Sequence, residues 1–322
     1  MRKEKRNENS ASTTTEELNS ASLAKPFLKW AGGKGQLLSK FCDFYPEELK
    51  SGLITHYYEP FIGGGAVFFE VAQQYNIQSA YLYDINEELI LTWRVIQQDV
   101  LKVIEILDSF QKQYEKLDDE KQSEFYYEVR ADFNRNLGRI NYSKYSEHWI
   151  LRAAQIIFMN RTCFNGLFRL NQKGEFNVPA GRYKNPSILD EQNLMKVSKL
   201  LEIAEIKNAG FEAVEHDLVE NSFVYFDPPY RPISKTSDFT AYSKLKFEDN
   251  EQRQLAELFH RLHKKGIKQM LSNSDPKNND PNDNFFDEIY KDYAISRIPA
   301  RRMINSDASK RVAINEIIVT NY

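Results

Sequence analysis

The sequence predicts an α/β fold with an open, Rossmann-like sheet, and three stretches predict it. Residues 57–75 give a short strand, a glycine turn and an amphipathic helix. Residues 80–84 give a second strand, which ends on Asp84. Residues 223–230 give an apolar strand that stops at Asp227 and two prolines. Because open α/β sheets bind ligands at the carboxyl ends of their strands, both acids are placed at a candidate site.

Composition sets the limits of the interpretation. The 322 residues are enough for one large domain or two smaller ones. The formal net charge is −3, so any contact with nucleic acid has to use local basic patches. Cys42 and Cys163 are too few and too far apart for a disulfide framework or a zinc site, and we expect no metal. Because neither a membrane-spanning run nor a signal-peptide pattern occurs, we expect a cytoplasmic protein with no membrane contact. We also expect it to be monomeric.

The N-terminal part begins with a polar stretch. Residues 1–22 combine a basic start with a Ser-Thr-Thr-Thr run and predict a disordered tail. Residues 27–34, Phe-Leu-Lys-Trp-Ala-Gly-Gly-Lys, then predict a glycine turn before a helix that carries Leu37, Leu38 and Phe41. Taken alone, this segment equally fits an ordinary turn of the core.

The glycine turn at residues 63–65 lies between a strand and a helix predicted at 66–75. Glycines let the backbone pass close to a ligand, and the helix N-terminus lies behind them. Asp84 follows Gly65 by nineteen residues. At that spacing, an acid that ends the second strand is placed to accept hydrogen bonds from a ribose. The pair predicts a nucleoside-type cofactor, and the turn lacks the G-x-x-x-x-G-K-[ST] pattern of a phosphate-binding loop.

The character of the chain changes after Asn86, where helical patterns dominate. Helices are predicted at 87–114, 124–134 and 148–159. Residues 160–184 then predict a short hairpin with an Asn-Gln-Lys-Gly turn. This hairpin has five basic residues and one acidic residue, a local charge of +4, interleaved with aromatic and amide side chains. Such a cluster suits contact with DNA, although any single member equally fits a solvated surface.

The last part of the chain returns to alternating helices and strands. We expect a helix at 251–265 and strands at 267–271, 293–298 and 313–320. The loop between the last two strands predicts a second basic patch. Its members are Arg301, Arg302, Lys310 and Arg311.

The tetrapeptide Asp227-Pro228-Pro229-Tyr230 has the strongest chemical meaning. Its prolines fix φ and lack N–H groups, so the strand ends in a rigid turn, which could also be purely structural. The tetrapeptide is similar to the signature of amino-methyltransferases, which use S-adenosylmethionine to methylate an exocyclic or amide nitrogen. Hydrogen bonds from an amino group to the Asp227 carboxylate and the Pro228 carbonyl would free the nitrogen lone pair. Tyr230 offers a face on which an extruded base stacks.

The motifs in this order resemble the DNA adenine N6-methyltransferase (Dam) family, whose members modify GATC. The resemblance spans roughly residues 25–320 and rests on the stretches 27–34, 59–61, 165–167, 174–179 and 227–230. It implies a class I S-adenosylmethionine-dependent methyltransferase sheet with an inserted, mostly helical DNA-recognition domain. The catalytic domain would comprise residues 23–86 and 190–322, and the target-recognition domain residues 87–189.

The resemblance also implies roles for single residues at the site of chemistry. Asp227, Pro228, Pro229 and Tyr230 would hold a flipped adenine. The cofactor site would be lined by Trp30, Lys34, Glu59, Phe61, Gly63, Gly65, Asp84 and Asp227.

A further group would contact double-stranded DNA. It comprises Lys29, Phe164, Asn165, Leu167, Arg169, Pro179, Arg182, Arg301 and Arg302. Lys29 and Arg169 would read guanines, and Leu167 and Pro179 would face the thymine. Phe164 and Asn165 match the pair that inserts beside the opened base pair. Phe164 stands where a family pattern has Tyr, which keeps an apolar wedge.

The sequence leaves other functions open. An N4-cytosine methyltransferase shares the amino chemistry, although Ser in place of Asp227 is commoner in that family. A DNA-binding protein that keeps the fold without catalysis is disfavoured by the intact motifs at 227–230 and 63–65. RNA and protein amide methyltransferases more often carry Asn before the prolines and lack the hairpin. Whether the enzyme works alone or beside a restriction nuclease stays open as well.

Overall fold

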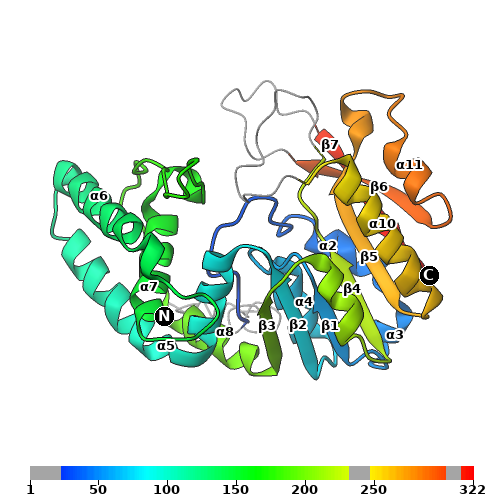
Figure 1. The fold of residues 1–322 in the computed structure, drawn as a ribbon, viewed down its shortest axis with the longest axis horizontal. Helices are drawn as coiled ribbons and strands as arrows, with labels where there is room; N and C mark the ends of the chain where they lie inside the picture. The colour runs from blue at the N-terminus through cyan, green and yellow to red at the C-terminus, as the bar shows by residue number, and fades with distance from the viewer. Residues whose placement is uncertain (1–22, 232–246, 302–312) are drawn as a thin grey trace, which may run out of the picture.

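The computed structural model of the chain describes residues 23–231, 247–301 and 313–322. The predicted tail, residues 1–22, lies outside these ranges, and so does Arg302. Figure 1 shows a sheet with its covering helices on the right and a group of helices on the left. No helix within the described ranges is both long enough and apolar enough to cross a membrane.

The described strands form one mixed sheet of seven strands in the order β3-β2-β1-β4-β5-β7-β6. Their bounds are β1 His56–Glu59, β2 Ser79–Asp84, β3 Ala204–Asn208, β4 Ser222–Phe226, β5 Lys268–Ser274, β6 Ala294–Arg301 and β7 Ala313–Thr320. Neighbouring strands from β3 to β5 run parallel, and β7 lies antiparallel between β5 and β6. The predicted α/β fold is confirmed, and the structure adds β3, which the sequence analysis did not identify.

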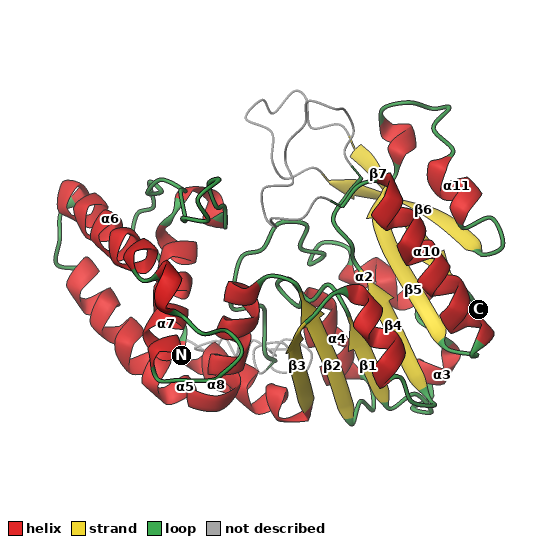
Figure 2. Cartoon of the chain, viewed as in Figure 1, coloured by secondary structure: helices red, strands yellow, loops and turns green. Residues whose placement is uncertain are grey.

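Strand β4 is covered on both faces. Phe223 and Tyr225 belong to the core that includes residues of α2 (Leu38–Phe41) and α4 (Ala66–Gln74). Val224 and Phe226 belong to a second core, with residues of α10 (Asp249–Lys264) and α11 (Phe285–Ile289). Because successive side chains of a strand point to opposite faces, a strand covered twice requires an unbroken apolar run. Figure 2 shows helices on both sides of the sheet that contains β4.

The order of the strands brings three acids to one edge of the sheet. β1 pairs in parallel with β2 on one side and with β4 on the other, so their carboxyl ends lie together. Glu59 and Asp84 end β1 and β2, and Asp227 directly follows β4. From β1, the strands β2 and β3 are added on one side, and β4 and β5 are added on the other, so the strand order reverses between β1 and β4. Open α/β sheets bind ligands at such a reversal.

The helices on the left of Figure 1 are α5 (Glu87–Tyr114), α6 (Asp119–Arg135) and α7 (His148–Thr162), with α8 (Glu191–Leu200) nearer the sheet. The three predicted helices are confirmed, although α6 begins earlier and α7 ends later than expected. Asn86 caps α5 by accepting a hydrogen bond from the backbone N–H of Leu89. A buried ion pair between Glu88 and Arg152 joins α5 to α7. The guanidinium also lies 3.7 Å from the ring centre of Phe133 on α6, so one charged group ties three helices together.

The predicted hairpin forms, but it has isolated bridges in place of a continuous ladder. Leu170 pairs with Phe176, and the Gly174 N–H donates to the Asn171 carbonyl, 2.9 Å away, within the expected turn. Side chains of α6 supply further support. Asn134 exchanges two hydrogen bonds with the backbone of Phe176, at 2.8 and 3.0 Å. The hairpin is therefore fixed by the helical region on which it lies.

Candidate active site

A buried lysine lies at the centre of the site. Lys34 comes from the turn near the N-terminus, and only 3% of the residue is exposed. Its Nζ donates to Asp227 Oδ1 at 2.5 Å, to the Gly32 carbonyl at 3.0 Å and to the Tyr230 hydroxyl at 3.1 Å. Glu316 Oε2 lies 3.9 Å away. The structure thus joins the predicted residues Lys34, Asp227 and Tyr230 in one hydrogen-bonded group.

The charges in this group depend on one another. Burial alone would lower the pKa of Lys34, but Asp227, Tyr230 and Glu316 outweigh it and raise the pKa. Burial raises the pKa of Asp227, and the ammonium of Lys34 opposes that rise. Lys34 therefore stays protonated, and its charge favours the ionised form of Asp227.

The Asp227 carboxylate is held by one of its two oxygens. Ser272 of β5 donates to Asp227 Oδ1 at 3.4 Å, the same oxygen that accepts from Lys34. Ser272 is itself paired with the Tyr225 hydroxyl at 2.7 Å. The hydrogen bonds that the described residues make to Asp227 thus go to Oδ1, and 19% of the side chain is exposed.

The turn after Asp227 is anchored by a helix. Gln252 of α10 donates from Nε2 to the carbonyl of Pro229 at 3.0 Å. Pro228 is buried and Pro229 is exposed. Ser272 and Gln252 were not predicted as site residues, because a serine in a strand and a glutamine in a helix carry no motif of their own.

The glycine turn contacts Asp84 directly. The Gly63 N–H donates to Asp84 Oδ2 at 3.2 Å, and the Asn86 N–H donates to Oδ1 at 2.9 Å. Gly65 has φ +71°, and a Cβ there would lie 2.5 Å from the Trp93 ring, so another residue would be both strained and crowded. Burial raises the pKa of Asp84 to about 6.

The other residues expected at the cofactor site lie around this edge. Glu59 is buried, and its Oε2 accepts from the Tyr57 hydroxyl at 2.6 Å. Burial raises the pKa of Glu59 well above its ordinary value. Phe61 is half-buried beside Phe211, with 5.7 Å between the ring centres. Trp30 stacks on Phe168 of the hairpin segment at 5.4 Å.

Lys29 lies against the hairpin segment. Its backbone N–H donates to Asn160 Oδ1 at 2.8 Å, and Asn160 Nδ2 donates back to its carbonyl at 2.8 Å. A Cβ on Gly166, which has φ +63°, would lie 2.5 Å from Lys29 Cδ. The ammonium lies 5.0 Å from the ring centre of Tyr183. Lys29, which is predicted to read a guanine, is therefore positioned by the hairpin segment. The contact runs through Asn160, which the sequence analysis did not single out as a site residue.

The predicted DNA-contacting side chains of the hairpin segment are mostly exposed. Phe164 is 52% exposed, an unusual position for a phenylalanine. Arg169 donates from Nε to Asn177 Oδ1 at 2.8 Å. Asn165, Pro179 and Arg182 are exposed, and Leu167 is partly buried. Arg301 ends β6, but its side chain lies outside the described part of the structure, as does all of Arg302.

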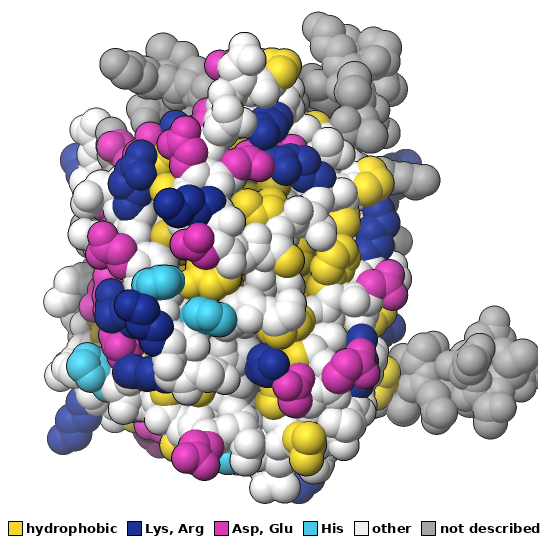
Figure 3. All heavy atoms as spheres, turned by 90° about the vertical axis from the view of Figure 1, so that its right-hand side faces the viewer, with side chains coloured by type: hydrophobic (Ala, Val, Ile, Leu, Met, Phe, Trp, Pro, Cys, Tyr) yellow, Lys and Arg dark blue, Asp and Glu magenta, His cyan; other side chains and the backbone are white. Residues whose placement is uncertain are grey.

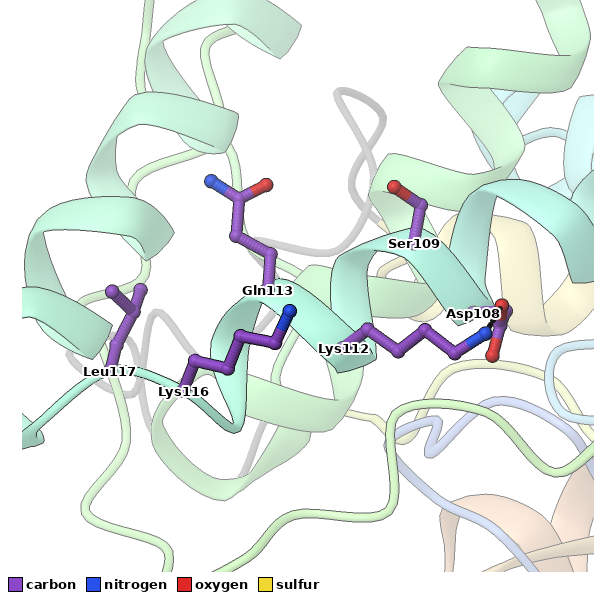
Figure 4. Close-up of a pocket in the computed structure, with 6 residues that line it drawn as sticks. All are labelled: Asp108, Ser109, Lys112, Gln113, Lys116 and Leu117. Atoms are coloured by element: carbon purple, nitrogen blue, oxygen red, sulfur yellow. Dashed lines mark hydrogen bonds and ion pairs between the residues drawn. The ribbon is translucent and has the colours of Figure 1, made fainter.

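Two surface hollows lie away from this group of residues. A hollow of about 540 Å³ is lined by Asp108, Ser109, Lys112, Gln113, Lys116 and Leu117. Figure 4 shows that all six come from the end of α5 and the residues after it. The second, of about 670 Å³, lies at the start of α5 and the end of β3, and Glu87, Arg94 and Lys207 are among its lining residues. Neither includes a member of the Lys34 group, and the described residues contain no cluster suited to a metal ion.

On the face at the right of Figure 1, the described side chains form no strong basic patch. Figure 3 views this face directly, and its basic and acidic side chains lie interspersed. Basic side chains are also paired with acids elsewhere in this part of the chain, as in the ion pairs Arg261–Glu215 and Arg297–Asp287. The hairpin segment, by contrast, exposes the basic side chains Arg169 and Arg182 and also exposes Phe164.

Comparison with known proteins gives consistent matches. The family model described as "D12 class N6 adenine-specific DNA methyltransferase" matches residues 30–304. The chain is 49% identical to "Type II methyltransferase M.MjaIII" of Methanocaldococcus jannaschii, over 92% of this chain and 99% of that protein. It is 41% identical to "Type II methyltransferase M1.LlaDCHI" of Lactococcus lactis, over 92% and 95%. It is 33% identical to "DNA adenine methylase" of Haemophilus influenzae, over 91% and 92%.

Proposed function

The chain belongs to the D12 class of N6 adenine-specific DNA methyltransferases, and from this premise we propose that methyl transfer takes place at Asp227-Pro228-Pro229-Tyr230. The protein is an S-adenosylmethionine-dependent enzyme with the class I methyltransferase fold, and DNA is its substrate. Its family decides against the N4-cytosine and the non-catalytic alternatives. The observation that carries the proposed site is the anchoring of Asp227 by Lys34 and Ser272 through one carboxylate oxygen.

The residues at the sheet edge fit S-adenosylmethionine, which has a ribose and a cationic sulfonium. Asp84, a partly exposed residue, ends β2 and is placed to accept hydrogen bonds from the ribose hydroxyls. The acids Glu59 and Asp227 share the positive charge of Lys34, and burial raises the pKa of both. An additional cation therefore relieves unfavourable charge at this edge. When bound, the cofactor supplies an electrophilic methyl group.

The residues of the tetrapeptide would prepare the adenine amino group for attack. The lone pair of that nitrogen is delocalised into the ring, which makes it a poor nucleophile. With Asp227 Oδ1 already engaged, Oδ2 is left to accept one N–H, and the Pro228 carbonyl accepts the other. Both acceptors favour a more tetrahedral nitrogen whose lone pair is available.

The target adenine has to leave the duplex to reach this site. Tyr230 supplies an aromatic face for the extruded base, and its hydroxyl is fixed between Lys34 and Glu316. The exposed Phe164 serves as the wedge beside the opened pair. Asn165, in a left-handed conformation with φ 56°, turns the backbone directly after it.

We propose GATC as the target sequence. Lys29, which lies against the hairpin segment, and Arg169, which belongs to it, are exposed basic side chains, and both types bind guanine O6 and N7 in the major groove. Two relatives carry the name type II methyltransferase and another the name DNA adenine methylase, and we propose that this enzyme acts either alone or as the partner of a restriction nuclease.

We further propose that the enzyme is a cytoplasmic monomer with a recognition domain at residues 87–189.

The test combines product analysis with digestion. DNA from cells that express the enzyme should contain N6-methyladenine, and GATC sites in it should resist cleavage by a methylation-sensitive nuclease. DNA from cells that express Asp227→Ala serves as the control. Methylation mapped to adenines outside GATC would overturn the proposed target, and unmodified adenine would overturn the proposed activity.

A further inference from the structure

Glu316 is a buried acid in the centre of an apolar strand. It lies in β7, opposite Ser274 of β5 and Ile298 of β6, and only 7% of the residue is exposed. Its Oε1 accepts a hydrogen bond from the Tyr230 hydroxyl at 2.8 Å. Its Oε2 is buried and has no hydrogen-bond partner among the described residues. Burying a carboxylate with one oxygen unpaired costs free energy, so the position calls for an explanation other than packing.

The partners of Glu316 belong to the site of chemistry. The Tyr230 hydroxyl that donates to Glu316 also accepts from Lys34 Nζ at 3.1 Å. Lys34 Nζ in turn donates to Asp227 Oδ1. A chain of three contacts therefore leads from Glu316 through Tyr230 and Lys34 to the carboxylate that would accept the adenine amino group. The 3.9 Å ion pair between Glu316 and Lys34 closes this arrangement.

We propose that Glu316 is a positioning residue for methyl transfer: it holds Tyr230 and Lys34 so that Asp227 Oδ1 stays engaged and Oδ2 faces the adenine amino group. This inference rests on the proposed function and deepens it. Glu316 does not touch the reacting atoms. It acts through Tyr230, which would stack on the adenine, and through Lys34, which holds Asp227. The role explains why a buried acid stands in a strand segment, residues 314–319, whose other members apart from Asn315 are apolar.

The two contacts of Glu316 can be separated by substitution. Glu316→Gln keeps a carbonyl oxygen that accepts from Tyr230, but it removes the charge opposite Lys34. Glu316→Ala removes both. Tyr230→Phe removes the hydroxyl and keeps the stacking face. Glu288→Gln is the matched control, since Glu288 is an exposed acid of α11 outside this group.

Single-turnover methylation of duplex DNA separates positioning from folding and binding. We expect Glu316→Gln to slow methyl transfer about tenfold, and Glu316→Ala to slow it more, as loss of hydrogen bonds to charged groups does. The affinities for S-adenosylmethionine and for DNA should stay within about twofold of wild type, and Glu288→Gln should match wild type in every respect. Because Glu316→Ala and Tyr230→Phe break the same hydrogen bond, the double variant should lose less than the product of the two single losses.

Three results would overturn the inference. The first is an unchanged rate in both Glu316 variants. The second is a loss of rate matched by an equal loss of affinity for cofactor, which a merely structural residue would give. The third is fully multiplicative losses in the double variant. N6-methyladenine formed by the wild-type enzyme in the same reactions keeps these failures distinct from failure of the proposed function, which would overturn both.

Discussion

Lys34 and Asp227 are 193 positions apart in the sequence, and the Lys34 ammonium lies 2.5 Å from Asp227 Oδ1. This contact joins the turn near the N-terminus to the end of β4, which carries the proposed methyl-transfer site. It fixes the orientation of the carboxylate and supplies the charge that favours its ionised form.

The first prediction concerns Lys34. Lys34→Met should slow methyl transfer by at least about tenfold, because Asp227 then loses both an anchor and a compensating charge. Burial would then raise the pKa of Asp227 further, with only the hydrogen bond from Ser272 left to oppose it, so the remaining activity should increase as pH rises and ionises the acid. Single-turnover rates measured against pH would check this. A rate–pH profile identical to that of wild type would show that Lys34 does not control Asp227.

The second prediction concerns pH and the cofactor. The pKa of Asp84 in the folded protein is about 6, raised by burial. Because the ionised form accepts hydrogen bonds from ribose hydroxyls, affinity for S-adenosylmethionine should fall as pH drops below about 6. Asp84→Asn should bind more weakly at neutral pH and should lose this part of the pH dependence. Calorimetric titration at several pH values measures both, and an unchanged pH dependence in the variant would contradict the assignment.

The third prediction concerns recognition. Arg169→Ala should raise methylation of sites altered at one guanine relative to GATC, since a good bidentate contact discriminates by about 1–3 kcal/mol. Arg182→Ala is the matched variant: if Arg182 binds phosphate, its loss should weaken binding to all sequences alike and reduce the salt dependence. Competition between oligonucleotides at two salt concentrations separates the two effects. Equal loss on every site in Arg169→Ala would argue that Arg169 binds only phosphate.

The fourth prediction concerns the position of the Lys29 side chain against Gly166. Gly166→Ala places a Cβ 2.5 Å from Lys29 Cδ at a residue with φ +63°. We expect it to destabilise the protein by about 1 kcal/mol or more and to weaken discrimination at the guanine that Lys29 reads. Gly138→Ala is the control, because nothing lies within 4 Å of the added Cβ there. Thermal unfolding and the oligonucleotide competition measure the two effects. Equal stability and equal discrimination in the two variants would refute the proposed contact between Gly166 and Lys29.

Local patterns account for much of what the sequence predicted. The apolar run of β4 and the glycine turn before α4 depend on neighbouring residues, so they could be recognised directly. Strand β3, Ala204–Asn208, was missed because it lies at an edge of the sheet, where only Ile206 of its five residues is buried. Its alternation of apolar and polar residues covers only four positions, Ala204 to Lys207, and its apolar residues form no run.

Contacts between distant segments account for what the sequence did not reveal. The family resemblance placed Lys34 and Asp227 at one cofactor site, but their direct ion pair depends on how the N-terminal turn packs over β4. Glu316 carried one signal, an acid inside a predicted strand, and its role could be inferred only from the position of Tyr230. Asn160 resembled any polar residue at the end of a helix until its hydrogen bonds to Lys29 were located.

The central claim is that Asp227 accepts a hydrogen bond from the adenine amino group. The most direct test is the single-turnover rate of methyl transfer by Asp227→Ala on duplex DNA, measured with saturating S-adenosylmethionine and with folding checked by thermal unfolding. We expect the rate to fall by roughly 10²–10³, as it does when one preorganised hydrogen-bonding group is removed from an active site. A folded Asp227→Ala variant that transfers methyl groups at a rate near that of wild type would contradict the account.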